Sequence, residues 1–205
     1  GRDLHAEVEL KRLDPHGRIV FGAGGELITT SDDRRMAEAM ARLSPADARR
    51  YTHFKEAGRR RYRRLQFSLE TPCMSLLDLL SWRRLPALPW LAPWRTLYED
   101  QKRFFHDPRI RHGLSFQWKY LGMSPYSAPG MFSFLTFLEL EYGLYHPVGG
   151  CHALSEAMAR VARDMGVSIR LGEPVERIVF QGRRAVGVVS ASGETRADAV
   201  VINAD

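Results

Sequence analysis

The sequence predicts a mixed α/β chain with α+β character in its amino-terminal part, and three observations predict that class. Apolar residues alternate over about the first thirty positions, as they do in strands. The stretch 71–143 has a helical pattern that prolines interrupt. After residue 145, one amphipathic helix precedes short runs rich in Val and Ile. We therefore expect two parts, residues 1–144 and residues 145–205.

In the first part, Val8, Leu10 and Leu13 precede a Pro-His-Gly turn, and two further apolar runs surround the glycines at 22–25. This pattern predicts a small antiparallel meander, in which the glycines form a hairpin turn. They superficially imitate a phosphate-binding loop, but no helix follows them. Ser31, with the two aspartates after it, predicts the start of a helix that ends near Leu43. Ser44 and Pro45 predict the start of a second helix, which is expected to run from Pro45 to about Leu69.

The stretch 71–143 is the aromatic centre of the sequence, because it contains all four tryptophans. Its uncharged run 120–138 approaches the roughly 20 residues that span a bilayer. Pro125 and Pro129 interrupt that run, so we expect a buried or interfacial segment there.

The second part begins with an amphipathic helix that carries Leu154, Met158, Val161 and Met165 on one face. Gly166 is expected to end this helix. Four strands are predicted beyond it, at 168–171, 175–180, 185–190 and 199–203, with a turn at 192–194.

Composition narrows the classes of function. Of the 205 residues, 44% are hydrophobic and 26% are charged, which excludes intrinsic disorder and collagen-like repeats. The net charge of +6 favours an anionic partner: nucleic acid, acidic lipid or a phosphate-bearing cofactor. Cys73 and Cys151 are too few for a disulfide scaffold and lie in no metal-ligand spacing. We therefore expect a reducing, cytoplasmic location and no metal site.

An ordered succession of motifs fills the last sixty residues. It comprises P-x-G-G at 147–150, G-x-x-I at 166–169, V-x-x-I at 175–178, G-V at 187–188 and A-D-x-V-V-x-N-A-D at 197–205. This succession resembles that of the carotenoid (phytoene) desaturase family of flavin oxidoreductases. The blocks at 121–129 and 141–143 narrow the resemblance to bacterial phytoene or squalene-type desaturases. It extends over essentially the whole chain.

The resemblance implies an FAD/NAD(P)-binding, Rossmann-like flavoprotein with a mixed helical and antiparallel substrate-binding domain. Residues 1–144 would form the substrate-binding, lid and membrane-docking part, and residues 145–205 would form part of the FAD-binding domain. The family's G-x-G-x-x-G turn lies amino-terminal to anything present here, so the sequence is expected to be an internal fragment.

The same resemblance implies residues that contact the FAD. Gly149 and Gly150 would let the backbone pass close to the flavin or a neighbouring helix, or would simply form a strand-to-helix turn. Val175 would offer its backbone to the adenine, or would pack in the core. The end of the last strand would lead back to the cofactor, or would be an ordinary core strand; it comprises Asn203, Ala204 and Asp205.

Asp78, within a run of leucines, matches the place where the family carries its proposed acid/base carboxylate. Burial among leucines would raise its pKa, as a general acid requires. The alternative is a helix cap or a solvent-facing position. Glu139 and Glu141 are second candidates, and Glu141 matches a glutamate usual in this stretch that we expect to be structural.

The run 58–64 contains five arginines. Three interpretations of this run stay open: a solvated helix face, attraction to anionic lipids, or nucleic-acid binding. No nucleic-acid-binding module surrounds them, so no nucleic-acid partner is expected. We expect a peripheral membrane enzyme that takes an apolar polyene through the mouth of a long apolar tunnel. Its flavin would be reoxidised by quinone or oxygen.

Several alternatives stay open. The match also fits a squalene-type or hydroxy-carotenoid desaturase, a carotenoid ketolase or a retinol saturase. A non-catalytic lipid-binding module that keeps only the fold is the alternative from another class.

Overall fold

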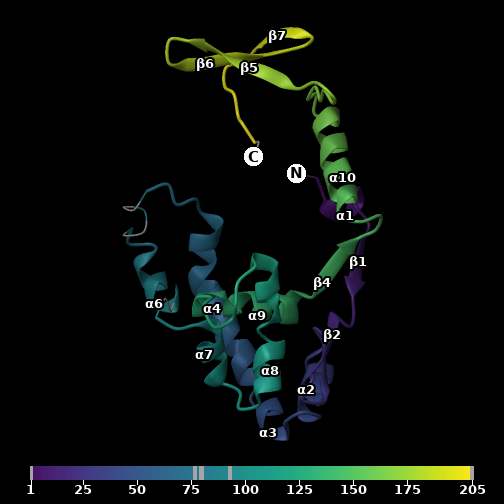
Figure 1. Cartoon of the computed structure of the whole chain (residues 1–205), viewed down its shortest axis with the longest axis vertical. Coiled ribbons are helices and arrows are strands. Elements are labelled where there is room, and N and C mark those ends of the chain that lie inside the picture. The colour runs from purple at the N-terminus through teal and green to yellow at the C-terminus, as the bar shows by residue number, and fades with distance from the viewer. Residues whose placement is uncertain (1, 76–77, 79–80, 92–93, 204–205) are drawn as a thin grey trace. The chain divides into compact units, whose positions relative to one another are not determined.

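The computed structural model of the chain describes residues 2–75, 78, 81–91 and 94–203. Its contacts divide the chain into two units. The helical unit comprises residues 9–148, and the small unit comprises the described residues of 1–8 and 149–205 (Figure 1). Each unit is described by itself.

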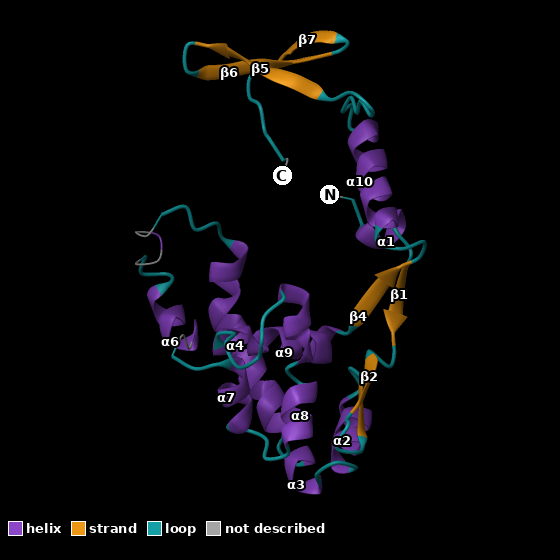
Figure 2. Cartoon of the chain, in the orientation of Figure 1, coloured by secondary structure: helices purple, strands orange, loops and turns teal. Residues whose placement is uncertain are grey.

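Helices dominate the helical unit (Figure 2). They are α2 (Asp33–Ala41), α3 (Pro45–Ala48), α4 (Tyr51–Glu70), α6 (Leu88–Leu91), α7 (Leu97–Lys102), α8 (Pro108–Gly113) and α9 (Ser133–Tyr142), with the short 3-10 helices η1 (Leu85–Ala87), η2 (Phe116–Leu121) and η3 (Gly130–Phe132). The proline-interrupted helical pattern predicted for 71–143 is therefore confirmed where the structure describes it.

The expected three-stranded meander is wrong. Strands β2 (Gly17–Val20) and β3 (Glu26–Thr29) form an isolated antiparallel hairpin. Strand β1 (Leu10–Leu13) instead pairs with β4 (Leu144–Pro147), which the sequence did not predict, and Leu10 lies opposite Pro147. Alternation of apolar residues indicates a strand but not its partner.

The glycines at 22–25 form the hairpin turn that was predicted. Gly24 and Gly25 have φ values of +91° and +88°, which favour glycine. A Cβ on Gly25 would also lie 2.7 Å from Leu43 Cδ2. The prediction that these glycines form a hairpin turn, and not a phosphate-binding loop, is therefore confirmed.

The single helix expected from Pro45 to Leu69 is two helices, because α3 ends at Ala48 and α4 begins at Tyr51. A tertiary contact accompanies the break. The fully buried Asp47 carboxylate accepts hydrogen bonds from the backbone N–H groups of His106 and Asp107, at 2.9 and 2.7 Å to Oδ2. Ser44 caps α3 as expected, by accepting from the N–H of Asp47.

Helices α4 and α9 pack closely in the helical unit (Figure 1). Gly58 on α4 faces Phe137 on α9, and a Cβ on Gly58 would lie 2.7 Å from Phe137 Cβ. Trp118, Tyr51, Phe105 and Phe137 are at most 2% exposed. Burial of each such side chain contributes roughly 1.5–3 kcal/mol or more, so these four aromatic residues stabilise the core of the helical unit.

An ion-pair network joins α2, α4 and α9. Arg59 donates two hydrogen bonds to Glu141 Oε1 and one to Oε2, the shortest being 2.7 Å. Lys55, one turn earlier on α4, lies 3.0 Å from Glu141 and 2.6 Å from Asp33. Tyr51 also donates to Asp33. Burial alone would raise the pKa of Glu141, but the hydrogen bonds from Arg59 and Lys55 outweigh it and lower that pKa.

The small unit contains α1 (Leu4–Glu7), α10 (His152–Asp164) and a three-stranded antiparallel sheet of β5 (Val175–Gln181), β6 (Arg184–Ser190) and β7 (Gly193–Arg196). Gly166 follows α10 with a φ of +88°, as expected of a helix end. Gly187 on β6 allows close pairing with β7, because a Cβ there would collide with the Thr195 carbonyl oxygen.

Two of the four strands predicted in the small unit are wrong. Residues 168–171 and 199–203 are irregular. The turn predicted at 192–194 lies at 191–192, because β7 already begins at Gly193. Leu171 and Val201 are 82% and 89% exposed. A strand needs a partner with which to form backbone hydrogen bonds, and the structure pairs neither segment.

We expect Glu141→Gln to lower the free energy of unfolding by about 1–3 kcal/mol, because it leaves Lys55 and Arg59 without their shared carboxylate. A pKa lowered by folding gives stability that is present above about pH 4.3 and lost as the pH falls through the depressed value. The variant should therefore lose less stability on acidification than the unaltered protein. Urea unfolding at pH 7 and pH 3 measures both effects.

Glu38→Gln is the matched control, because Glu38 pairs at 3.3 Å with Arg34 while both side chains are exposed. Such pairs contribute at most about 1 kcal/mol. Equal destabilisation by both substitutions would contradict a special role for Glu141.

Candidate functional site

The predicted cofactor residues Gly149 and Gly150 form the turn that leads into α10. Their φ values are +89° and +91°. Cys151 precedes the helix and makes no side-chain capping bond to it. A Cβ at Gly150 would meet nothing within 4 Å, so backbone conformation rather than crowding requires glycine there. The turn therefore presents backbone and an uncapped helix amino terminus to an open space.

A cavity of about 640 Å³ in the small unit brings together two other predicted residues, Val175 and Asn203. Its remaining lining residues come from the sheet and from the irregular segment that ends the described chain: Glu176, Arg177, Ile178, Phe180, Val188, Val200, Val201 and Ile202. Ala204 and Asp205 lie outside the described residues. The walls are mostly apolar with one arginine and one glutamate, a composition that suits a flat heterocycle carrying a charged group.

Asp78 lies in the helical unit, and its expected raised pKa is wrong. Its Oδ2 atom accepts hydrogen bonds of 2.8 Å from the backbone N–H groups of Met74 and Ser75. These two bonds stabilise the charged form and lower the pKa of Asp78. Leucine neighbours in the sequence therefore do not predict a raised pKa for Asp78, because backbone N–H groups stabilise its charge.

Of the two arginines that follow Asp78, Arg84 is buried and donates to the carbonyl oxygens of Thr71 and Pro72, at 3.0 and 2.9 Å. Arg83 stacks over the rings of Phe67 and Trp82. Arg84 therefore has a structural role, since its hydrogen bonds fix the start of the segment that contains Asp78.

Among the residues that the structure describes, the carboxyl group whose pKa is raised is that of Glu139 on α9. Burial raises this pKa, and a 2.7 Å hydrogen bond from Gln117 Nε2 only partly opposes it. Gln117 in turn accepts from Thr136 Oγ1 at 3.2 Å. The sequence signal was present, because Glu139 lies between Leu138 and Leu140 in the apolar run of α9.

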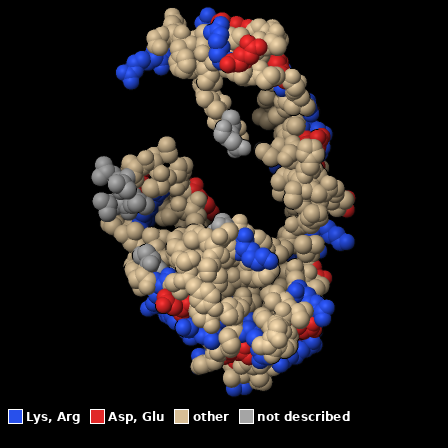
Figure 3. All heavy atoms as spheres, in the orientation of Figure 1, with Lys and Arg blue, Asp and Glu red and all other residues tan. Residues whose placement is uncertain are grey.

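The arginine run is not simply a solvated face. Arg59 is bound to Glu141, and Arg61 to the buried Asp100. Arg63 and Arg64 are exposed. On the face seen in Figure 3, Lys and Arg are interspersed with Asp and Glu over the helical unit.

Large apolar side chains are exposed around the end of α4 and the segments that follow it. They include Met74 at 86%, Trp82 at 77% and Trp94 at 66%. Exposed apolar side chains of this size are typical of surfaces that contact a partner or a membrane interface. Among the helices in the described residues, none is long and apolar enough to cross a membrane. The same residues contain no group of three or more His, Cys, Asp or Glu that could hold a metal ion.

Residues 94–205 match the family described as flavin containing amine oxidoreductase. The chain belongs to this family. Membership confirms the predicted flavin cofactor and implies an FAD-binding, Rossmann-like flavoprotein, while the described residues are helices and antiparallel strand pairs.

The chain is also similar to proteins named as carotenoid desaturases. The chain is 40% identical to the all-trans-zeta-carotene desaturase of Myxococcus xanthus and 38% identical to the zeta-carotene-forming phytoene desaturase of the same organism, both over the whole of this chain. It is 34% identical to a 4,4'-diapophytoene desaturase of Methylomonas over 97% of its length. The chain spans about 40% of the length of these relatives. The resemblance to bacterial carotenoid desaturases is confirmed.

We expect Glu139→Gln to raise the melting temperature at pH 7 and to leave it nearly unchanged at pH 4. Folding raises the pKa of Glu139, so its contribution to stability is present below the ordinary glutamate pKa and is lost as the pH rises through the raised value. Glutamine mimics the protonated form and can still accept from Gln117. Thermal unfolding at the two pH values measures the difference.

Glu56→Gln is the control, because Glu56 is half exposed on α4. A melting temperature that falls at pH 7 in the Glu139 variant alone would mean that the charged form is the stable one, contrary to this expectation.

Proposed function

We propose that the protein is an FAD-dependent desaturase of an apolar isoprenoid polyene, phytoene or a related carotenoid precursor. The observation that carries this proposal is the ordered succession of motifs over 121–205, together with relatives whose names specify zeta-carotene, phytoene and diapophytoene. Those three polyenes differ in length or in unsaturation, so we propose a class of substrate and not a single compound.

The proposed division of labour follows the sequence boundary. Residues 1–144 bind the substrate and dock at the membrane, and residues 145–205 are part of the FAD-binding domain. The glycine turn and the 640 Å³ cavity of the small unit support the second assignment. The exposed aromatic residues of the helical unit support the first, and the proposed mouth of the polyene tunnel lies among them.

The small unit's residues fit a flavin nucleotide. Gly149 and Gly150 offer backbone without side chains at the uncapped start of α10, which favours an anionic or carbonyl oxygen. Val175 would offer its backbone to the adenine, and Asn203 would belong to the segment that leads back to the cofactor; both line the largely apolar cavity. Ala204 and Asp205 complete the proposed set. When bound, the flavin supplies a two-electron acceptor for hydride.

Desaturation also removes a proton from the carbon next to the one that loses hydride, and this chain must handle that proton. Its lowered pKa keeps Asp78 ionised at neutral pH, so we assign it to stabilise positive charge that develops on the substrate. An ionised carboxylate accepts a proton and cannot donate one, and the lowered pKa makes Asp78 a weak base. Quinone or oxygen is the proposed final electron acceptor.

The proposed location is a cytoplasmic membrane surface with anionic lipids. Trp82 and Trp94 have the amphipathic character that suits the interface, and the exposed Arg63 and Arg64 supply charge complementary to acidic head groups. This charge and apolar exposure favour lipid over nucleic acid as the anionic partner.

Asp78→Asn in the flavin-loaded protein is expected to reduce desaturation by about 10²-fold or more. Both backbone hydrogen bonds end on the one atom Oδ2, so an asparagine oxygen placed there retains them while the charge is removed. Turnover with phytoene and flavin absorbance measure activity and occupancy together.

Asp164→Asn is the control, because Asp164 is an exposed partner of Arg2 in the small unit. Near-normal turnover in the Asp78 variant, at full flavin occupancy, would contradict the catalytic assignment and would mean that Asp78 only stabilises the turn at residues 74–78. A flavin-free protein that still binds the polyene would favour the alternative lipid-binding module.

Arg63→Gln combined with Arg64→Gln is expected to weaken binding to anionic vesicles by about tenfold or more. Each basic residue near such a surface contributes about 1 kcal/mol, and the binding should decline as salt rises. Vesicle co-sedimentation at 0.05 M and 0.5 M salt measures both.

The paired control is Arg34→Gln with Arg183→Gln, which removes the same charge from two other exposed positions. Equal binding by both double variants would leave Arg63 and Arg64 as a solvated face.

A further inference from the structure

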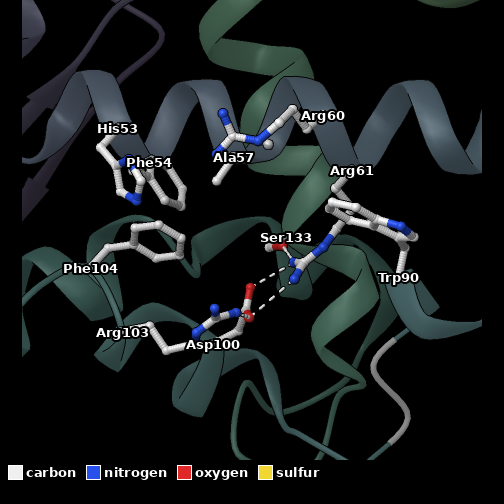
Figure 4. Close-up of a pocket in the computed structure, with 11 residues that line it drawn as sticks. His53, Phe54, Ala57, Arg60, Arg61, Trp90, Asp100, Arg103, Phe104 and Ser133 are labelled. Atoms are coloured by element: carbon white, nitrogen blue, oxygen red, sulfur yellow. Dashed lines mark hydrogen bonds and ion pairs between the residues drawn. The ribbon is translucent and has the colours of Figure 1, made fainter.

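A second cavity lies in the helical unit, between α4, α6 and α7 and the start of α9, and has a volume of about 250 Å³. Its lining is unlike that of an apolar tunnel, because three arginines enter it: Arg60 and Arg61 from α4, and Arg103 from the end of α7. Figure 4 shows Arg60 and Arg103 on opposite walls. Asp100 is the carboxylate that lines it.

Arg61 and Asp100 form the fixed floor of this cavity. Arg61 donates to both Asp100 oxygens, at 2.6 and 3.1 Å, to the Gly130 carbonyl at 3.0 Å, and to Ser133 Oγ. Asp100 is only 2% exposed. The four acceptor atoms hold the guanidinium of Arg61 in one orientation, and Asp100 balances its charge.

The other two arginines are less fully compensated. The carboxylate near Arg60 is Glu56, at 3.9 Å, and both of these side chains are more than half exposed. Arg103 reaches Asp100 at 3.3 Å, an oxygen it shares with Arg61, and is also half exposed. Three guanidinium groups therefore line a cavity with one lining carboxylate, which leaves an excess of two positive charges among its lining residues.

Aromatic side chains in the remaining walls strengthen the attraction that these arginines exert on an anion. The guanidinium carbon of Arg103 lies 5.8 Å from the centroid of the Phe104 ring, and Trp90 lies beside Arg61 (Figure 4). Aromatic walls exclude water from one side of a charge and so strengthen its attraction for a counter-ion. The volume is several times the roughly 30 Å³ of one liquid water molecule, so an oxyanion of several atoms fits.

We propose that this cavity binds a phosphate-class dianion through Arg60 and Arg103, with Arg61 as the positioned floor. Planar guanidinium groups pair with two phosphate oxygens at once, and a doubly charged phosphate monoester matches the excess of two positive charges. A lipid phosphomonoester head group and free inorganic phosphate share this chemistry. The site differs from the small unit's candidate flavin residues and from Asp78, and nothing in the proposed desaturation uses it.

Calorimetric titration of the intact, flavin-loaded protein tests the proposal, at constant ionic strength, with inorganic phosphate and with a soluble short-chain phosphatidate. Arg60→Gln combined with Arg103→Gln should weaken binding by about tenfold or more. Arg34→Gln combined with Arg183→Gln is the matched control, because it removes the same charge from two exposed positions outside the cavity and outside the proposed membrane contact. This variant should bind both ligands as the unaltered protein does. The soluble lipid keeps this test independent of vesicle docking and of turnover.

Binding of both ligands, or of either alone, supports the site, and the ligand that binds identifies its source. Absence of binding to both, or equal weakening in the two double variants, would overturn it. A second measurement avoids substitution: bound phosphate should slow phenylglyoxal modification of Arg60 and Arg103, but not of the exposed Arg34, in the unaltered protein. If phosphate slowed modification of all three arginines equally, or of none of them, the proposal would also be overturned.

Discussion

The helical unit depends on one long helix, α4, because its Lys and Arg side chains form ion pairs with carboxylates from three other helices. Lys55 and Arg59 are four residues apart and therefore share a face, which receives Glu141 from α9 and Asp33 from α2. Arg61 points to a different side and receives Asp100 from α7. Three elements distant in the sequence are thereby fixed around a single axis. Apolar packing alone, which lacks direction, would leave their rotation about that axis less defined.

Features that depend on neighbouring residues could be predicted from the sequence. Ser44 caps α3, Gly24 and Gly25 close the β2–β3 hairpin, and Gly166 follows the end of α10. Features that depend on distant partners could not. The pairing of β1 with β4 joins residues more than 130 positions apart, and nothing in either segment specifies the other.

The candidate site divides in the same way. Val175 and Asn203 were chosen by motif position, and the structure places both on one cavity. The pKa of Asp78 was misjudged, because a composition of leucines indicates burial but does not reveal the two backbone donors. Glu139 has the raised pKa instead, since helical periodicity places it against Gln117 in a partly closed environment. Electrostatic environment is a property of the folded contacts, which sequence neighbours reproduce poorly.

The bonds from Arg84 to the carbonyls of Thr71 and Pro72 join the two ends of the segment that includes the exposed Met74 and Trp82. Joining the ends of a loop removes much of the entropy that the chain would otherwise lose when the loop becomes ordered. That loss occurs once, during folding, and not again at each encounter with a surface. Met74 and Trp82 therefore belong to a segment whose two ends are already joined by Arg84, and this part of the ordering entropy is not lost again when a partner surface binds.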